Sequence, residues 1–285
     1  MLVVQAQHLG MCFGVRDALT KAREIAHPAS VTIHGELVHN PQIQSEMALR
    51  GFHQVGEEER DLPPTPEVLI TAHGISNRER ERLQSQGKRL IDTTCPLVRR
   101  VHKSALRLAR LGYFVVVVGR HEHVEVEGLI GDLEDYVVVS SVQEVACWNR
   151  RKIGVINQTT TRPELLQRIH ATICQRNPDA EIELVDTICS PTRDRQQAVR
   201  ELLDRVEALV VVGGANSNNT RELGQMAERA QKPWLHIQQA DQLRPEWFTG
   251  FRLVGLTAGT STPDSVIDEV HRRLITIAAA SKISA

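Results

Sequence analysis

Three of the five cysteines stand directly before a stretch with helical periodicity. Cys12, Cys95 and Cys189 recur at intervals of about 90 residues, close to the size of a small domain. Two of them end near-identical strings, Asp92–Cys95 (DTTC) and Asp186–Cys189 (DTIC). A helix N-terminus stabilises a thiolate, which is the form that binds metals. A single such cysteine is more often structural, but three at equivalent points indicate one three-thiolate metal site with a free coordination position.

The cysteines also indicate the compartment. Their number is odd and they are widely spaced, which argues against a disulfide framework and predicts a reducing, cytoplasmic location. No CxxC pair is present, so a metal site would have to draw its ligands from distant segments. Cys147 and Cys174 have no counterpart in the repeat and are interpreted as structural.

Polar residues follow the expected strands and could bind an anion. His39, His73 and His123 each stand after an apolar run. Imidazoles donate hydrogen bonds and add charge when protonated, so three of them at strand ends indicate an anion clamp. Small hydroxyl and amide residues follow two further strands, in Asn216–Thr220 and Thr257–Ser261. Helix capping alone would explain either segment, whereas together they suggest a phosphate cradle.

One carboxylate is placed to move a proton. Glu125 lies among the strand-end clusters, and Thr159 follows the next expected strand, where its hydroxyl could orient Glu125 or relay the proton. A neighbouring anion would raise the pKa of Glu125 and suit it to that role. The neighbouring Glu127 is interpreted as solvated. The chain has neither a Walker A loop nor a GxGxxG segment, so ATP and NAD sites are unsupported.

Strand-like and helix-like stretches alternate along the chain, which predicts an α/β fold with mostly parallel sheets. The clearest apolar runs are residues 30–33, 67–70, 113–118, 152–156, 208–212 and 253–256. The clearest helical patterns are residues 15–26, 98–111, 163–174, 195–206 and 263–280. Because ligands bind where parallel strands end, the six polar clusters predict one shared cavity.

The recurrence of cysteine, helix and strands predicts three pseudo-equivalent α/β units. We place the first at residues 13–95, the second at 96–188 and the third at 189–280, the last joined by the N-terminal segment 1–12. The final residues, 281–285, are expected to fray.

Composition excludes several classes of protein. Lys and Arg number 34 against 35 Asp and Glu, so there is no cationic excess for nucleic-acid binding. The apolar runs are far shorter than the ~20 residues that cross a bilayer, and no export signal is visible. We therefore expect no nucleic-acid or membrane partner.

Taken in order, the motifs resemble those of the LytB family of 4-hydroxy-3-methylbut-2-enyl diphosphate reductases. The resemblance spans residues 4–277, although the family's frequent His-Pro-Glu is here His123-Val124-Glu125, and Asn218 stands where Ser or Gly is common. The matching strings are GMCFGV (10–15), VHN (38–40), AHG (72–74), DTTCPLV (92–98), HVEVEG (123–128), QTT (158–160), NSNNT (216–220) and TAG (257–259) through Pro263-Asp264.

The resemblance implies a trefoil of three α/β units around one [4Fe-4S] cluster per chain, held by Cys12, Cys95 and Cys189. It implies reductive removal of the substrate's allylic hydroxyl at the open iron, giving isopentenyl and dimethylallyl diphosphates at the last step of the methylerythritol phosphate pathway to isoprenoids. Glu125 and Thr159 fall at the proton-delivery positions, and ferredoxin or flavodoxin would supply electrons. The diphosphate-binding positions are His39, His73, His123, Ser217, Asn218, Asn219 and Ser261.

Three other functions remain as alternatives. A quinolinate-synthase-like [4Fe-4S] enzyme shares the triplicated layout, but the strand ends offer little Arg or Lys for dicarboxylates. A non-catalytic cluster-binding redox protein would not need the anion clamp or Glu125. A zinc hydrolase could use the same cysteines and is separable by metal analysis.

Overall fold

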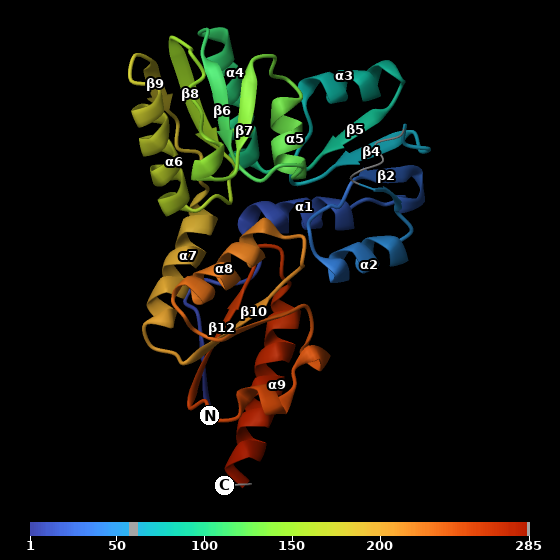
Figure 1. Cartoon of the computed structure of the whole chain (residues 1–285). Coiled ribbons are helices and arrows are strands. Elements are labelled where there is room, and N and C mark those ends of the chain that lie inside the picture. Colours follow the sequence, from blue (N-terminus) through green and yellow to red (C-terminus); the bar gives the residue numbers. More distant parts are fainter. Residues whose placement is uncertain (57–61, 284–285) are drawn as a thin grey trace. The chain divides into compact units, whose positions relative to one another are not determined.

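The computed structural model describes residues 1–56 and 62–283, and within them strands and helices alternate. The strands form three four-stranded sheets in which every pairing is parallel (Figure 1). The predicted α/β fold with parallel sheets is therefore confirmed. The six strands expected from apolar runs all occupy central positions in these sheets.

The sheet with strand order β3-β2-β4-β5 is the first along the chain. Central strands β2 and β4 are almost wholly buried, whereas edge strands β3 and β5 are partly exposed. Its strands are β2 (Val31–His34), β3 (His53–Val55), β4 (Glu67–Ile70) and β5 (Arg89–Asp92). The helices of this part of the chain are α1 (Phe13–Arg23), η1 (Pro28–Ser30), α2 (Pro41–Leu49) and α3 (Asn77–Ser85).

The second sheet has the order β7-β6-β8-β9 and repeats this plan. Alternate residues of β6 enter two cores: Val116 packs with α6, and Val117 packs with α4 and α5. Its strands are β6 (Phe114–Val118), β7 (Tyr136–Val139), β8 (Lys152–Asn157) and β9 (Glu181–Leu184). The accompanying helices are α4 (Pro96–Arg110), α5 (Val124–Ile130), η2 (Val142–Glu144) and α6 (Pro163–Arg176).

The third sheet, of order β1-β12-β10-β11, joins the N-terminal strand to the last strand. Its strands are β1 (Leu2–Gln5), β10 (Ala208–Val212), β11 (Trp234–Ile237) and β12 (Leu253–Ala258). The helices around it are α7 (Ser190–Leu203), α8 (Asn218–Arg229), η3 (Ala240–Gln242), η4 (Pro245–Phe248) and α9 (Asp264–Ile283). The fraying expected for residues 281–285 falls in part on residues 284–285, which lie outside the described residues, while α9 continues to Ile283.

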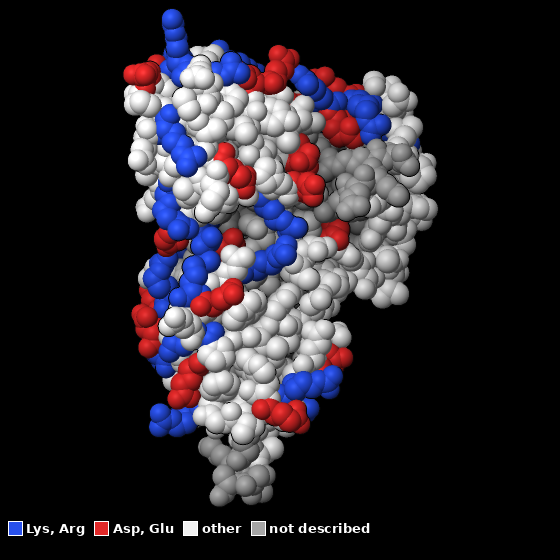
Figure 2. Space-filling model, viewed as in Figure 1, with Lys and Arg blue, Asp and Glu red and all other residues white. Residues whose placement is uncertain are grey.

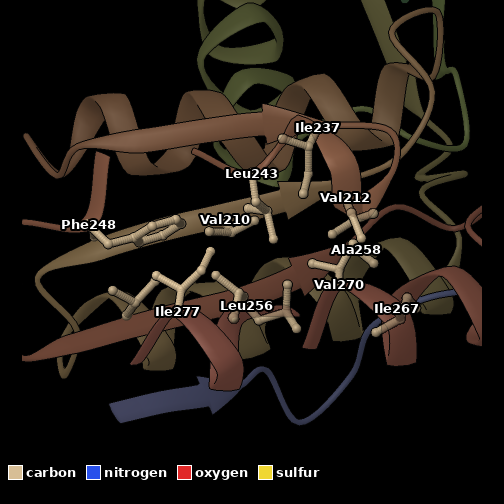
Figure 3. Close-up of a cluster of buried hydrophobic side chains, with 14 residues drawn as sticks. Val210, Val212, Ile237, Leu243, Phe248, Leu256, Ala258, Ile267, Val270 and Ile277 are labelled. Atoms are coloured by element: carbon tan, nitrogen blue, oxygen red, sulfur yellow. The ribbon is translucent and has the colours of Figure 1, made fainter. Parts of the chain in front are cut away.

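Both faces of the third sheet are covered by helices. On one face Val210 and Leu256 pack against Val270 and Ile277 of α9, as Figure 3 shows. On the other face Leu209 packs with residues of α7 and α8. Burial on both faces explains why β10 is a continuous apolar run rather than an alternating one.

The chain divides into two compact units. The first unit contains Met1–Val15, His39–Ile43 and Ser190–Ala285, with the third sheet; the second contains Arg16–Val38 and Gln44–Cys189, with the other two sheets. The boundaries of the three predicted units stay a prediction.

Surface charge is mixed. Figure 2 shows Lys and Arg side chains lying among Asp and Glu side chains over much of the visible face, in keeping with the formal net charge of -1. Among the described residues, no helix is both long and apolar enough to span a bilayer.

Candidate functional site

Cys95 and Cys189 end two loops of the second unit that are built alike, Asp92–Cys95 and Asp186–Cys189, here called the Asp–Thr loops. In each, the aspartate Oδ1 accepts the N–H of the residue two positions on, at 2.9 and 3.0 Å. In each, the threonine hydroxyl donates to the carbonyl of the last residue of the adjacent central strand. The near-identical strings DTTC and DTIC thus encode one local structure.

Cys12 ends a different loop in the first unit, Leu9–Cys12, here called the glycine loop. Gly10 has φ +76°, a left-handed conformation that favours glycine. Its carbonyl accepts two hydrogen bonds from the buried guanidinium of Arg195, at 3.0 and 2.7 Å. A buried arginine thus stabilises this loop, in place of the aspartate and threonine of the other two.

All three cysteines nevertheless share one backbone anchor. The N–H of each donates to the carbonyl of the residue two positions after the adjacent central strand ends. The acceptors are Thr260 for Cys12 at 3.0 Å, Ala72 for Cys95 at 3.1 Å and Thr159 for Cys189 at 3.0 Å. The three cysteines are therefore equivalent in backbone position, as the repeat predicted.

These three cysteines are partly exposed, and none is bridged in a disulfide within the described chain. Each cysteine directly precedes a helix, α1, α4 or α7. Within residues 1–56 and 62–283, no three His, Cys, Asp or Glu residues form a group that could hold a metal ion. Cys12 belongs to the first unit, and Cys95 and Cys189 belong to the second. Cys147 and Cys174 are exposed, outside these loops.

Glu125 and Thr159 form a buried pair in the second unit. Glu125 is 4% exposed and Thr159 is 5% exposed. The Thr159 N–H donates to Glu125 Oε1 at 2.7 Å, and its hydroxyl donates to Oε2 at 2.8 Å. Because the Thr159 carbonyl also accepts the Cys189 N–H, one residue links the carboxylate to a cysteine loop. The structure brings together the two residues predicted to deliver protons.

Two of the three predicted histidines also meet in this unit. The rings of His73 and His123 pack edge to face with centroids 5.8 Å apart. His123 is the N-cap of α5, and its Nδ1 accepts the N–H of Glu125 at 3.1 Å. The neutral ring therefore carries its proton on Nε2, which is a donor. Val124 occupies the first helical position, where proline is common, and α5 begins there all the same.

In the first unit, Asn219 lies buried without hydrogen-bond partners. Its residue is 1% exposed, and neither side-chain amide atom has a partner in the described structure. Thr220 and Thr257 each have a buried hydroxyl that also has no hydrogen-bond partner in the described structure. Ser217 caps α8 by accepting the Thr220 N–H at 3.3 Å. Unpaired buried polar atoms at a helix N-terminus are typical of a binding site for a polar ligand.

Glycines bring the backbone close around this cluster. A Cβ on Gly259 would lie 2.0 Å from Thr220 Oγ1, and one on Gly214 would lie 2.4 Å from the His39 carbonyl oxygen. That carbonyl accepts the Ser261 hydroxyl at 3.0 Å. His39 thus lies with Ser261 in the first unit, although its place in the sequence put it in the predicted unit 13–95. Asn218 is half-buried at the start of α8.

The carboxylate of Asp92, at the start of the Asp92–Cys95 loop, interacts with two arginines. Burial opposes ionisation of Asp92, but hydrogen bonding by Thr94 and the charges of Arg80 and Arg99 outweigh it and lower the pKa of this carboxyl. Arg80 lies 2.9 Å and Arg99 3.2 Å from the Asp92 carboxylate. The Asp92–Cys95 loop is therefore held in part by charge.

Sequence reasoning missed two residues of the site. Arg195, which anchors the glycine loop, reads as an ordinary helical arginine, and only its partner 185 residues away shows its role. Gln158 is 1% exposed, and its Nε2 is buried without a partner among the described residues. The string QTT at residues 158–160 is the one signal that could have found Gln158.

The chain is similar to proteins of one family over nearly its whole length. The sequence profile of the LytB protein family matches residues 3–275. The 4-hydroxy-3-methylbut-2-enyl diphosphate reductase of Aquifex aeolicus is 35% identical over 280 residues, covering 95% of each chain. The protein of the same name from Anaeromyxobacter sp. (strain K) is 37% identical over 268 residues, covering 93% of this chain and 95% of that one.

Two solved structures show the same fold. A diphosphate reductase from Plasmodium falciparum superposes with a TM-score of 0.88 at 24% identity, covering 95% of this chain and 87% of its own. A structure described as the terminal enzyme of the non-mevalonate pathway has a TM-score of 0.67 at 33% identity, covering 97% of this chain and 100% of its own. With the profile match and the relatives above 30% identity, this chain belongs to the LytB family.

Proposed function

We propose that this protein is a 4-hydroxy-3-methylbut-2-enyl diphosphate reductase of the methylerythritol phosphate pathway to isoprenoids, which removes the allylic hydroxyl of its substrate to form isopentenyl and dimethylallyl diphosphates. The names of the relatives support this activity. The structural observation that carries it is the buried Glu125–Thr159 pair, which the Thr159 carbonyl joins to the Cys189 loop. That pair would provide a proton donor that Thr159 links to the backbone of a proposed metal ligand.

The donor set fits one [4Fe-4S] cluster per chain, held by Cys12, Cys95 and Cys189. These cysteines are partly exposed, and each cysteine N–H donates to a carbonyl just beyond a strand. Such a cluster, when bound, supplies electrons and a Lewis-acidic iron for the departing hydroxyl. Cys147 and Cys174 lack this backbone anchor and take no part.

Polar, mostly uncharged side chains would bind the diphosphate. The buried Asn219 amide supports this role, because its donor and acceptor atoms are unpaired within the described protein. Hydroxyls and imidazoles add donors without a permanent buried charge. The proposed binding residues are His39, His73, His123, Ser217, Asn218, Asn219 and Ser261.

Glu125 holds and delivers a proton, and Thr159 positions it. The overall reaction consumes two electrons and two protons: the C–O bond breaks, the hydroxyl leaves as water with one proton, and the second proton adds to the allyl carbon. Both Glu125 oxygens are occupied by Thr159 donors, which fixes the carboxyl orientation. Burial of the pair excludes bulk water as a competing proton source.

The test of the activity is an anaerobic assay on purified protein. Iron and sulfide are quantified first, and oxidation of a reduced viologen dye is then followed with and without the hydroxylated allylic diphosphate. We expect about four irons per chain and substrate-dependent oxidation. An intact cluster without any response to substrate would refute the proposed reaction, and zinc in place of iron would refute the cofactor.

The test of the proton donor is Glu125→Gln. We expect turnover to fall by about 10²–10⁴-fold, because the amide cannot deliver a proton, while the substrate dissociation constant changes little. The matched control is Glu127→Gln, which alters an exposed carboxylate of the same helix and should leave turnover unchanged. Near-normal turnover of the Glu125 variant would remove this residue from the acid role.

A further inference from the structure

One face of α4 carries only positive charge. The helix contains no Asp or Glu, and its basic side chains recur at spacings of three and four residues, which places them on one side. The opposite side is buried through Val98, Val101, Ala105 and Leu108. The exposed basic residues, here called the α4 basic face, are Arg99, Arg100, Lys103, Arg107 and Arg110.

Most of this charge is not neutralised by neighbouring residues. Arg99 pairs with Asp92 and Arg107 pairs with Glu183. In the described part of the chain, Arg100, Lys103 and Arg110 make no ion pair. The face is also hollowed into a groove of about 440 Å³ lined by Pro96, Arg99, Arg100, Lys103, Ser104 and Arg107.

Helix stability accounts for Arg107 and Arg110, which lie in the last turn, but not for the rest of the α4 basic face. Arg99 and Arg100 lie near the positive end of the helix dipole, where cations are unfavourable. Arg99 and Lys103, and Lys103 and Arg107, are four residues apart and repel each other. Cations that are unfavourable in the first half of a helix, over a groove with unpaired basic groups, are typical of a binding surface for an anionic partner.

The position of the groove indicates which partner. Cys95 is the N-cap of α4, and the next residue, Pro96, lines the groove. The surface therefore begins one residue from a cysteine proposed to hold the cluster. The proposed reaction takes its electrons from another molecule, and a chain without a GxGxxG segment favours a protein carrier over a dinucleotide as that molecule.

We propose that the α4 basic face is the docking surface for an acidic one-electron carrier protein, a reduced ferredoxin or flavodoxin. This inference rests on the proposed function. Each docked carrier gives up one electron and is itself oxidised, so two encounters supply the two electrons of one turnover. The overall net charge of -1 weighs against nucleic acid as the occupant, because the chain outside this face has more acidic than basic residues.

The test is the double charge reversal Arg100→Glu and Lys103→Glu, which breaks no ion pair among the described residues. Activity is measured with two electron donors, a reduced acidic ferredoxin and a reduced viologen dye. At low ionic strength we expect the KM for ferredoxin to rise about tenfold, because electrostatic steering is lost. We expect activity with the small cationic dye to stay unchanged. Added salt should raise the KM of the original protein toward that of the variant.

The matched control is Arg168→Glu with Arg205→Glu, which makes the same change in net charge at two exposed arginines, one on α6 and one in the turn after α7. Equal ferredoxin KM values for the two double variants would overturn the proposal. Loss of binding to phosphatidylserine vesicles with an unaltered ferredoxin KM would overturn it in favour of a membrane. Absence of substrate-dependent dye oxidation in the original protein would instead refute the proposed function.

Discussion

The two Asp–Thr loops and the glycine loop reach one backbone arrangement by different chemistry. In all three, a cysteine N–H donates to a carbonyl just beyond a central strand. In the Asp–Thr loops, residues of the loop itself form the turn, through an aspartate oxygen and a threonine hydroxyl. In the glycine loop, a left-handed glycine and an arginine from another helix do so.

The three cysteine loops therefore share the backbone position of the cysteine, but not the interactions that form the loop. A local turn such as DTTC is written in adjacent residues and recurs visibly in the sequence. A turn held by Arg195 depends on a residue 185 positions away, so the glycine loop carries no matching string. Equivalent sites in a repeat can therefore diverge in sequence while their backbone anchors persist.

The largest expected effect tests whether the three cysteines are equivalent in function. Changing any of Cys12, Cys95 or Cys189 to Ser should abolish stable iron binding, because each supplies one proposed ligand. Iron and sulfide per chain are the measurement.

Cys147→Ser and Cys174→Ser are the controls and should keep normal iron content, since both residues lie outside the anchored loops. If the Cys12 variant alone kept its iron, the comparison would break, and the glycine loop would not be a ligand loop.

A smaller effect is expected on the stability of the glycine loop. In Gly10→Ala, the left-handed φ costs about 1–2 kcal/mol. The added Cβ would also lie 2.6 Å from Ile267 Cδ1, the far end of a flexible side chain, and its displacement adds about 1 kcal/mol. We expect the free energy of unfolding to fall by their sum, as measured by urea denaturation.

Gly250→Ala is matched to it, because Gly250 has φ +90° and open space around its Cβ position. It should show only the cost of about 1–2 kcal/mol for the backbone. Equal losses in the two variants would mean that packing against α9 adds nothing to the glycine loop.

The smallest effect concerns the charge that holds one Asp–Thr loop. Asp92→Asn keeps an oxygen for the Thr94 N–H but loses the attraction to Arg80 and Arg99, which are partly exposed. We expect a loss of about 1 kcal/mol at neutral pH. The pKa of Asp92 is lowered on folding, so this contribution is present above its ordinary value of 3.8 and is lost as the pH falls through the lowered value.

Unfolding free energies of the two proteins, measured from neutral to acidic pH, should therefore converge below pH 3.8. Asp135→Asn removes an exposed ion pair with Arg150 and is the control, with little expected change at any pH. A difference that persisted unchanged into acid would show that charge does not hold the loop.

The sequence predicted the central strands and left the edges unseen, for a physical reason. Strands β2, β4, β6, β8, β10 and β12 are mostly buried on both faces, and β6 and β10 are continuous apolar runs. The other six are edge strands with partly exposed side chains, and strands such as β9 (EIEL) have short mixed patterns that do not stand out. The edge strand β7 (YVVV) is an exception, because its apolar run was visible in the sequence but was not assigned.

The candidate site divides in the same way. The pairing of Glu125 with Thr159 was expected from strand-end positions, because parallel strands end at one edge of a sheet. The hydrogen bond from the Ser261 hydroxyl to the His39 carbonyl was not, since it joins residues 222 positions apart. Helix α2 lies between β2 and β3 in the chain, yet residues 39–43 belong to the first unit.

By itself, the sequence determined the α/β class, the repeat of the three cysteines and the types of polar residue at the strand ends, because each is encoded in neighbouring residues. Only the tertiary structure decided the pairing of β1 with β12, the hydrogen bonds from Arg195 to the Gly10 carbonyl and the backbone anchor of each cysteine. These depend on contacts between distant segments, which leave no local period or motif in the chain.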